Sequence, residues 1–195
     1  MGAPSATELP ETPDLYGAYP RLTDTQIEEL RTRGELRATQ PGEVLFREGD
    51  LDCDFFVIVE GKVAVVEGFG RHERLIGVHG PGRFLGEASL LTGEASFLTA
   101  VAREPGKVLA VPVRELRELV SEDTGLGDLI LRAFLLRRSI LIGLGTGFRI
   151  VGSCYSPDTR RLREFAGRNR LPHRFIDVEQ DQSAESVLCK LGIRP

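Results

Sequence analysis

The chain has 195 residues, of which 41% are hydrophobic and 28% are charged, and its formal net charge is −4. This composition is typical of a globular protein with room for one full core and a smaller second domain. The acidic balance argues against a surface for nucleic acid or for an anionic membrane, because such surfaces carry a basic excess.

The sequence shows neither a membrane span nor a secretion signal. No stretch reaches about 18 uninterrupted apolar residues, and the N-terminus MGAPSATELPETPD lacks a basic start followed by an apolar run. Cys53, Cys154 and Cys189 lie far apart without a CxxC motif, which favours free thiols in a reducing compartment. We therefore expect a cytoplasmic protein.

The N-terminal third of the chain begins without regular structure. Residues 1–20 carry four prolines and few large apolar groups, which predicts a flexible, extended arm. Thr23 or Asp24 then caps a short predicted helix that runs to about Arg33 and stops at Gly34.

From Leu36 to Pro112, short β-prone runs alternate with glycine turns. These runs read EVLF, DFFVIVE, KVAVVEG, ERLIGVH, FLTAVA and KVLAVPV. Their spacing of about ten residues predicts an antiparallel sandwich, roll or barrel. The pair Glu60-Gly61 stands between two of the runs and predicts a tight hairpin.

Beyond Val113 the apolar pattern becomes helical. RELRELVSED predicts one short helix, and a second begins near Thr124 and runs to Leu144. The apolar residues of the second helix follow i, i+3, i+4 spacing, and this apolar stripe is interrupted once, by Arg137. Further leucines extend the apolar surface beyond a single face. A helix this apolar must be covered on more than one side, either within the chain or, as an alternative, by the same helix of a second copy in a homodimer.

A second fold class follows the long helix. FRIVGS and PHRFIDVE read as strands, SPDTRRLREFAGRNR as a helix capped by Ser156 with Pro157 at its first position, and QSAESVLCKLGI as a further helix. This β-α-β-α order places a domain boundary near residues 144–148. We expect a first domain over 21–144 and a partial one over 148–195, and two strands and two helices bury so little that we expect a larger protein.

The stretch GEASLLTGEASFLTA at residues 86–100 has the build of a phosphate cradle, in which a helix N-terminus after a glycine offers free N–H groups to an anion. No arginine or lysine lies between Arg83 and Arg103 to complete it. Neighbouring strands offer other arginines, at positions 71, 74, 83 and 103, for which a solvated surface position is the alternative.

Three segments in order, PGEVLFREGD, DFFVIVEGKVAVV and PGRFLGEASLLTGE, resemble the cyclic-nucleotide-binding domain of catabolite-activator-type regulators, cyclic-nucleotide-dependent kinases and gated channels. The resemblance covers about residues 20–142. It implies an α+β fold: an antiparallel, jelly-roll-like β-roll with flanking helices and a long C-terminal helix.

The family's phosphate-binding cassette is similar to FGELALLxGxPRAAT. By this resemblance the candidate ligand-binding residues are Gly86, Glu87, Ala88, Ser89, Ser96 and Thr99. Glu87 would accept a hydrogen bond from a ribose hydroxyl. The alternative is that the acid is favoured at a helix N-terminus by the helix dipole, without any ligand. The family's arginine falls on Ser96 or Phe97, neither of which is a cation.

A charge-assisted pair to phosphate is worth about 1.5–3 kcal/mol, so its loss weakens cyclic-nucleotide binding by about 10–150-fold. The resemblance therefore implies a regulatory module with weakened or altered affinity for a cyclic nucleotide such as cyclic AMP. Another small anionic ligand is the alternative.

FRIVGSCYSPDTRRLREFAGRNRLPHRFIDVE resembles the first half of a thioredoxin/glutaredoxin-like domain in which Ser156 and Thr159 replace the cysteines of C-P-x-C. Hydroxyls cannot carry out dithiol exchange. Cys154 remains a candidate redox residue, with an inert cysteine at a strand end as the alternative, and Cys189 reads as core.

The combination of both modules resembles the N-terminal region of bacterial flavoproteins in which they precede a thioredoxin-reductase-like oxidoreductase. FAD and NADPH would then belong to a downstream domain, and these 195 residues would hold no cofactor, no metal and no catalytic activity. The histidines at 72, 79 and 173 are scattered, which argues against a metal site. Two alternatives stay open: a cyclic-AMP-sensing transcription regulator, which needs a helix-turn-helix after the long helix, and a ligand-free dimerisation scaffold.

Overall fold

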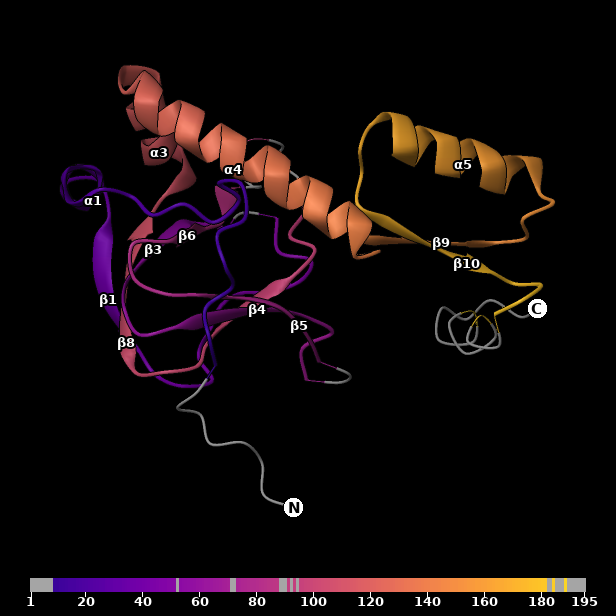
Figure 1. Ribbon diagram of the computed structural model, residues 1–195, viewed down its shortest axis with the longest axis horizontal. Coiled ribbons are helices and arrows are strands. Elements are labelled where there is room, and N and C mark those ends of the chain that lie inside the picture. The colour runs from indigo at the N-terminus through magenta and orange to yellow at the C-terminus, as the bar shows by residue number, and fades with distance from the viewer. Residues whose placement is uncertain are drawn as a thin grey trace, which may run out of the picture. The chain divides into compact units, whose positions relative to one another are not determined.

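The computed structural model describes residues 9–51, 53–70, 73–87, 91, 93, 95–181, 184 and 188. The chain divides into two compact units, Met1–Arg137 and Arg138–Pro195, which we describe separately (Figure 1). Among the described residues, no helix combines the length and the apolar character that crossing a membrane requires.

Unit 1 contains most of the regular structure. Its elements are α1 (Asp24–Arg31), β1 (Glu35–Thr39), β2 (Val44–Phe46), β3 (Phe55–Glu60), β4 (Val63–Glu67), β5 (Arg74–His79), β6 (Phe84–Leu85), β7 (Thr99–Ala102), β8 (Gly106–Val111), α3 (Val113–Glu122) and the larger part of α4 (Thr124–Gly143).

The strands form two antiparallel sheets of four, ordered β1-β8-β3-β6 and β2-β7-β4-β5. Two four-stranded sheets in this order form a jelly roll, so the predicted antiparallel β-roll is confirmed. Each of the six predicted runs contains one strand, and β1 and β6 are additional.

The predicted hairpin at Glu60-Gly61 is wrong. β3 pairs with β8 and β6, whereas β4 pairs with β5 and β7, so the chain at this point turns a corner from one sheet to the other. The link between β7 and β8 makes the same passage beside it, because a Cβ on Gly61 would lie 2.8 Å from the carbonyl oxygen of Pro105. Glu60-Gly61 does connect β3 to β4, but these two strands pair with other strands and not with each other.

Of the two predicted caps of α1, Thr23 is the one observed. Its side chain accepts from the backbone N–H of Gln26, and the Gln26 side chain accepts from the N–H of Thr23, which completes a capping box. The helix buries Leu30 and ends at Arg31, slightly before the predicted end.

The main core lies between the β1-β8-β3-β6 sheet and the helices. Its buried members are Leu22, Leu30, Phe55, Val57, Phe84, Leu109, Val111, Leu116, Leu119, Leu126, Ile130 and Ala133. The rings of Phe55 and Phe84 stack with centroids 5.2 Å apart. This packing fixes β6, after which the chain enters the glycine-acid pair of the predicted cassette.

The inward face of α4 consists of Leu126, Ile130, Ala133 and Arg137. These positions follow helical spacing, so the lapse in the apolar stripe is a buried arginine. Leu131 of the same helix is 43% exposed. The helix therefore packs within its own chain along one face and presents apolar surface on another.

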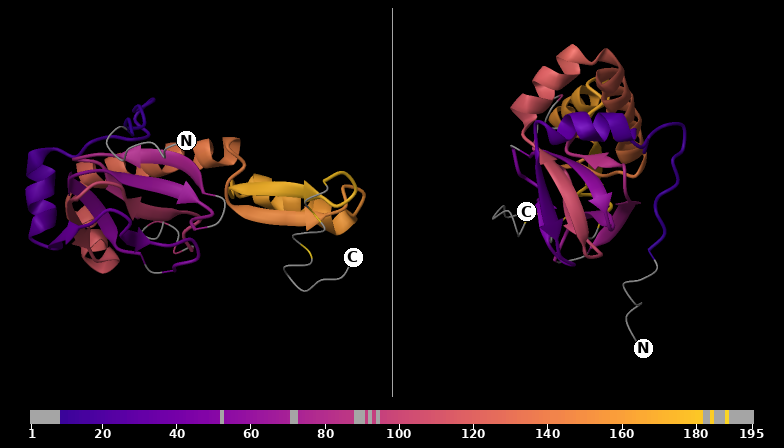
Figure 2. Two further views of the ribbon diagram at one scale, coloured as in Figure 1. Left: turned by 90° about the horizontal axis from the view of Figure 1, so that it is seen from below. Right: turned by 90° about the vertical axis from the view of Figure 1, so that its left-hand side faces the viewer.

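Unit 2 contains β9 (Phe148–Gly152), α5 (Pro157–Arg168) and β10 (His173–Asp177). The two strands pair in parallel, and α5 lies along one face of the pair (Figures 1 and 2). Ser156 caps α5 by accepting from the N–H of Thr159, and Pro157 is its first residue. The predicted β-α-β order is confirmed, while most of the predicted helix at 182–193 lies outside the described residues.

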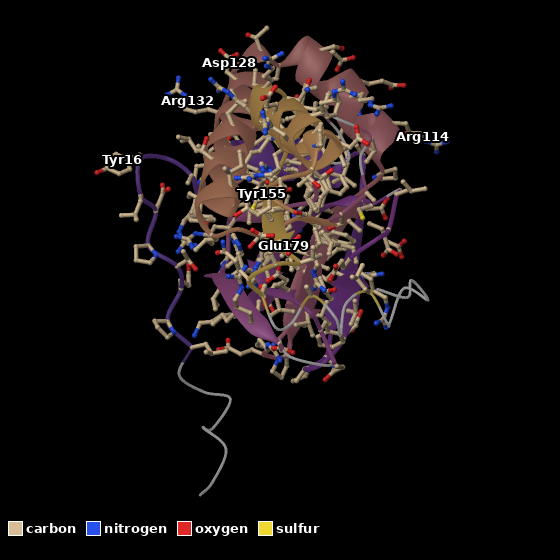
Figure 3. The ribbon with its side chains drawn as sticks, turned by 90° about the vertical axis from the view of Figure 1, so that its right-hand side faces the viewer. Tyr16, Arg114, Asp128, Arg132, Tyr155 and Glu179 are labelled. Atoms are coloured by element: carbon tan, nitrogen blue, oxygen red, sulfur yellow. The ribbon has the colours of Figure 1, made fainter. Side chains whose placement is uncertain are left out.

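The segment before α1 has no helix or strand from residue 9 to residue 23. It nevertheless buries Ala18, Tyr19 and Leu22, and the N–H of Leu22 donates to the carbonyl of Gly82. Tyr16 marks its turn, with φ at +59° and a side chain that points into solvent (Figure 3). This segment is therefore an extended chain that packs against the roll.

Candidate functional site

Gly86 opens the predicted cassette for a steric reason. Its φ is +91°, a left-handed conformation that favours glycine, and a Cβ at this position would clash with the carbonyl oxygen of Asp54. The chain can pass this close to the start of β3 only without a side chain. The glycine thus delivers the next residue, Glu87, to a buried position beside the core.

Glu87 forms a buried ion pair with Arg137 of α4. Their side chains are 11% and 9% exposed, and Arg137 Nη1 lies 2.8 Å from Glu87 Oε1. The guanidinium also donates from Nη1 to the carbonyl of Phe84 at 3.0 Å and from Nε to the carbonyl of Ala18 at 2.7 Å. A buried carboxylate without such a partner would be strongly destabilising, so Arg137 is what allows Glu87 to be buried.

Two aromatic rings flank the Arg137 guanidinium. Its central carbon lies 4.8 Å from the ring centroid of Phe84 and 5.3 Å from that of Tyr19. Cation–π contacts of this length stabilise a desolvated cation. Nη2 of Arg137 is buried and has no hydrogen-bond partner among the described residues.

Arg137 is the residue of this cluster that the sequence did not predict. The cation that pairs with Glu87 comes from α4, which follows the roll, and not from the cassette or from the neighbouring strands. The available signal was the single charge in the apolar stripe of that helix, because a charge on a buried face requires a partner.

Ser96 and Thr99, which the structure describes, have hydrogen-bond partners other than this pair. Ser96 Oγ donates to the carbonyl of Leu98 at 2.8 Å, and Thr99 Oγ1 accepts from the N–H of Glu48 at 3.1 Å. Ala88 and Ser89 lie outside the described residues. No hydrogen bond or ion pair links Ser96 to an arginine or lysine within the described part of the chain.

The arginines considered as substitutes have other partners. Arg74 pairs with Glu67 at 2.8 Å, and Arg103 pairs with Glu73. Arg83 is only 4% exposed and donates to the carbonyl of Thr12 at 2.7 Å, so the expectation of a solvated surface position is wrong for it. Arg71 lies outside the described residues.

His79 is buried beside the same cluster. Its ring packs edge-on against Tyr19 with centroids 5.2 Å apart. Burial lowers the pKa of His79 well below its ordinary value, and the charges of Arg137 and Arg83 lower it further. The imidazole is therefore neutral at physiological pH. Among the described residues, no three histidine, cysteine or acidic side chains converge as metal ligands would.

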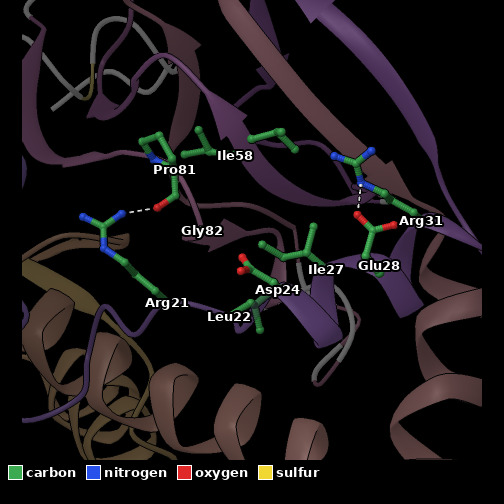
Figure 4. A pocket seen from close by; sticks show the side chains of 10 residues that line it. Arg21, Leu22, Asp24, Ile27, Glu28, Arg31, Ile58, Pro81 and Gly82 are labelled. Atoms are coloured by element: carbon green, nitrogen blue, oxygen red, sulfur yellow. Dashed lines mark hydrogen bonds and ion pairs between the residues drawn. The ribbon is translucent and has the colours of Figure 1, made fainter.

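A groove of about 370 Å³ lies apart from Glu87, between α1 and the turn that precedes β6 (Figure 4). Leu22, Ile27 and Ile58 give it apolar walls. On its charged rim Arg31 pairs with Glu28 at 3.3 Å, and Arg21 donates to the carbonyl of Pro81. The groove has neither Glu87 nor Arg137 in its lining.

The candidate redox residue Cys154 follows β9 in unit 2. Its backbone N–H donates to Asp177 Oδ1 at 3.3 Å. The pKa of the Cys154 thiol is raised, chiefly by a hydrogen bond to the Asp177 carboxylate. Since the thiolate is the reactive form, this neighbour suppresses the reactivity that a redox role requires.

Comparisons with known proteins agree with the geometry of unit 1. The family model described as cyclic nucleotide-binding domain matches residues 36–123. The cyclic AMP receptor protein of Thermus thermophilus is 30% identical over 101 residues, which are 51% of this chain and 45% of that protein. The matched segment therefore spans less than half the length of that relative.

Among solved structures, a transcriptional regulator from Thermotoga maritima shares the fold with a TM-score of 0.51 and 20% identity, over 60% of this chain and 96% of that one. The family match covers nearly all of the eight-stranded roll and α3, and it ends immediately before α4. Over residues 36–123 the roll of this chain is thus similar to the cyclic nucleotide-binding domain.

Proposed function

We propose that unit 1 is a regulatory sensor module whose ligand site is organised by Glu87 and Arg137, with weakened or altered affinity for cyclic nucleotides. The observation that carries this proposal is the pairing of the cassette's glutamate with a helix arginine, while Ser96 stands where a phosphate-binding arginine is expected. The acceptor for sugar hydroxyls is retained, and the cation for a cyclic phosphate is absent from its usual place.

Arg137 gives the site a different electrostatic character. Its charge is already balanced by Glu87, and only Nη2 has no partner among the described residues. A buried donor without a partner is uncommon and supports a ligand acceptor at this position. We infer a small ligand that offers hydroxyl donors to Glu87 and one acceptor to Arg137, a cyclic nucleotide at reduced affinity or another small anion.

Calorimetry with cyclic AMP and cyclic GMP on the full chain tests the proposal, and Ser96→Arg provides a gain of function. Placing a guanidinium at this position should tighten nucleotide binding by about 10–150-fold. Ser121→Arg, which adds the same charge at an exposed position of α3, should leave affinity unchanged. Tight binding by the unmodified chain would contradict the proposal, and binding by neither protein would favour the ligand-free scaffold.

We further propose that α4 carries the output of the module, because it contains Arg137 and continues into unit 2. A homodimer through α4 is part of this proposal and is supported by the exposed apolar side chain of Leu131. Sedimentation of Leu131→Glu tests it: a dimer that becomes monomeric supports the seam, and an unchanged mass contradicts it.

For the whole protein we propose regulation of a flavin-dependent, thioredoxin-reductase-like oxidoreductase, with FAD and NADPH bound by a downstream domain. The parallel β9-α5-β10 unit supports the thioredoxin-like resemblance on which this rests. Reading the gene past Pro195 tests it: a strand followed by GxGxxG and later CxxC supports the oxidoreductase, whereas a helix-turn-helix contradicts it.

The second candidate is a cyclic-AMP-sensing transcription regulator, favoured by the similarity to the Thermus receptor protein. The described residues after α4 follow a strand-helix-strand order instead of two helices joined by a turn. Fluorescence anisotropy with random-sequence duplex DNA at low salt distinguishes the candidates, because a DNA-binding regulator binds such duplexes through phosphate contacts.

A further inference from the structure

The segment Glu11–Tyr19 contacts the roll along the end of β5. The backbone N–H of Thr12 donates to the carbonyl of Val78 at 2.9 Å, and the N–H of Val78 donates to Thr12 Oγ1 at 2.8 Å. One threonine thus satisfies both backbone groups of a strand residue. The segment is attached at this point as an extra strand would be, without extending a regular ladder.

Charge reinforces the same end of the segment. Arg83 donates from Nη1 to the carbonyl of Thr12 and lies 3.5 Å from a carboxylate oxygen of Glu11. Glu11 is also paired with Arg21 at 2.7 Å. Arg83 is nearly fully buried, and the segment supplies two acceptors to its Nη1, which also donates to the carbonyl of Val78 at 3.4 Å.

The other end of the segment reaches the Glu87–Arg137 pair. Ala18 is 1% exposed and accepts from Arg137 Nε, while the Tyr19 ring lies over the same guanidinium. The N–H of Tyr19 donates to Asp14 Oδ1 at 2.7 Å, which closes the turn before it. Arg137 therefore holds the N-terminal segment with one nitrogen and the cassette glutamate with another.

We propose that Glu11–Tyr19 is a strap whose docking and the Glu87–Arg137 ion pair stabilise each other. When the strap is docked, the Ala18 carbonyl and the Tyr19 ring hold the guanidinium against Glu87 and shield the pair from water. When the strap is released, Arg137 loses an acceptor and becomes hydrated, which weakens the pair. The coupling is reciprocal. Breaking the ion pair at Glu87 must therefore weaken strap docking by the same factor by which releasing the strap weakens the ion pair.

The strap is built to release without unfolding of the roll. It contains no helix or strand, and it is attached by a few hydrogen bonds and ion pairs together with the buried side chains of Ala18 and Tyr19. Segments of this kind open locally at a free energy well below that of global unfolding. Tyr16 is 93% exposed at the turn of the strap, so a partner that displaces the strap would contact this side chain (Figure 3).

Hydrogen exchange of the full chain, without any ligand, tests the coupling. Glu87→Gln removes the charge that Arg137 pairs with, and it should speed exchange of the Thr12, Ala18 and Tyr19 amides by about tenfold or more. Glu60→Gln removes a carboxylate that pairs with Lys107 at the surface and should leave these amides unchanged. Equal strap exchange in the two variants would overturn the proposal, provided that the β8 amides of both stay protected.

The effect of the strap on Arg137 is measured by nuclear magnetic resonance of the Arg137 Nε–H group. Its signal is assigned as the one that is missing from the spectrum of Arg137→Lys. Thr12→Val weakens the attachment of the strap and should speed solvent exchange of this proton. Thr25→Val, an exposed position on α1, should not. An Nε–H signal that is unaffected by Thr12→Val contradicts the strap. Neither experiment involves a nucleotide, so failure of the ligand proposal leaves their outcome intact.

Discussion

The roll and the β9-α5-β10 unit use similar apolar sequences with different results. All four residues of β7 and the first four of β3 are buried, whereas β9, FRIVG, has no fully buried residue among those described. Phe148 of β9 and Phe165 of α5 are 48% and 60% exposed. The roll closes on itself through two sheets and its helices, whereas in the described part of unit 2 α5 lies along one face of a two-stranded sheet. Burial, and with it the energetic value of a side chain, is therefore decided by the neighbouring layers.

The largest expected effect contrasts one phenylalanine from each unit. Phe55→Ala empties a position that is 0% exposed and should cost about 3–5 kcal/mol of unfolding free energy. Phe165→Ala on α5 should change it by about 0.5 kcal/mol or less. Urea denaturation followed by circular dichroism measures both. Similar losses would show that the β9-α5-β10 unit is as tightly packed as the roll.

Two arginines sharpen the contrast between buried and exposed charge. Arg137→Met should cost about 3–5 kcal/mol because it leaves Glu87 buried without its cation, and adding Glu87→Gln should recover part of the loss. Arg33 pairs with three glutamates on the surface, and Arg33→Met should cost about 1 kcal/mol or less. The measurement is the denaturation midpoint of the unmodified chain, the two single arginine variants and the double variant. A loss of stability in Arg33→Met as large as that in Arg137→Met would contradict this prediction.

The buried His79 predicts a pH dependence of the roll. Its pKa is well below the unfolded value of about 6.5, so below that pH the unfolded state binds a proton that the folded state excludes. The stabilisation is complete above about pH 6.5 and is lost as the pH falls toward the folded pKa. Urea midpoints of the unmodified chain and of His79→Gln should converge on acidification. A pH-independent difference between them would show that the histidine titrates normally.

The smallest effect concerns Cys154 in unit 2. Asp177→Ala removes the carboxylate whose hydrogen bond is the chief cause of the raised pKa of the thiol, and its charge with it, so the thiolate fraction should increase. Alkylation of the Cys154 peptide by iodoacetamide at neutral pH, followed by mass spectrometry, should become several-fold faster. Unchanged labelling would mean that Asp177 does not control the thiol.

The elements of the fold were predictable because their signals are local. Apolar runs between glycine turns predicted six of the strands, and Thr23 and Ser156 predicted the helix caps that the structure shows. The pairing of the strands was not predictable in the same way. Glu60-Gly61 carries a turn signal, but the identity of the partner strands depends on β7 and β8, which lie far along the chain.

The site was predictable on one side only. Glu87 could be identified because it belongs to a contiguous stretch with a recognisable pattern. Arg137 could not, since it reaches Glu87 through the packing of α4, and its only local sign was a charge among leucines. The burial of Ala18 and Tyr19 likewise comes from tertiary contacts and not from the proline-rich composition of their segment.

The corner at Gly61 has a consequence for biosynthesis. β8 is the last strand of the roll to emerge from the ribosome, yet it occupies the position between β1 and β3, and β7 separates β2 from β4 in the same manner. β1 and β3 therefore lack the strand between them until the chain has been translated through Val111, and β2 and β4 lack theirs until it has been translated through Ala102. Contacts of such long sequence separation form slowly. The nascent roll should therefore depend on chaperones until β7 and β8 insert together.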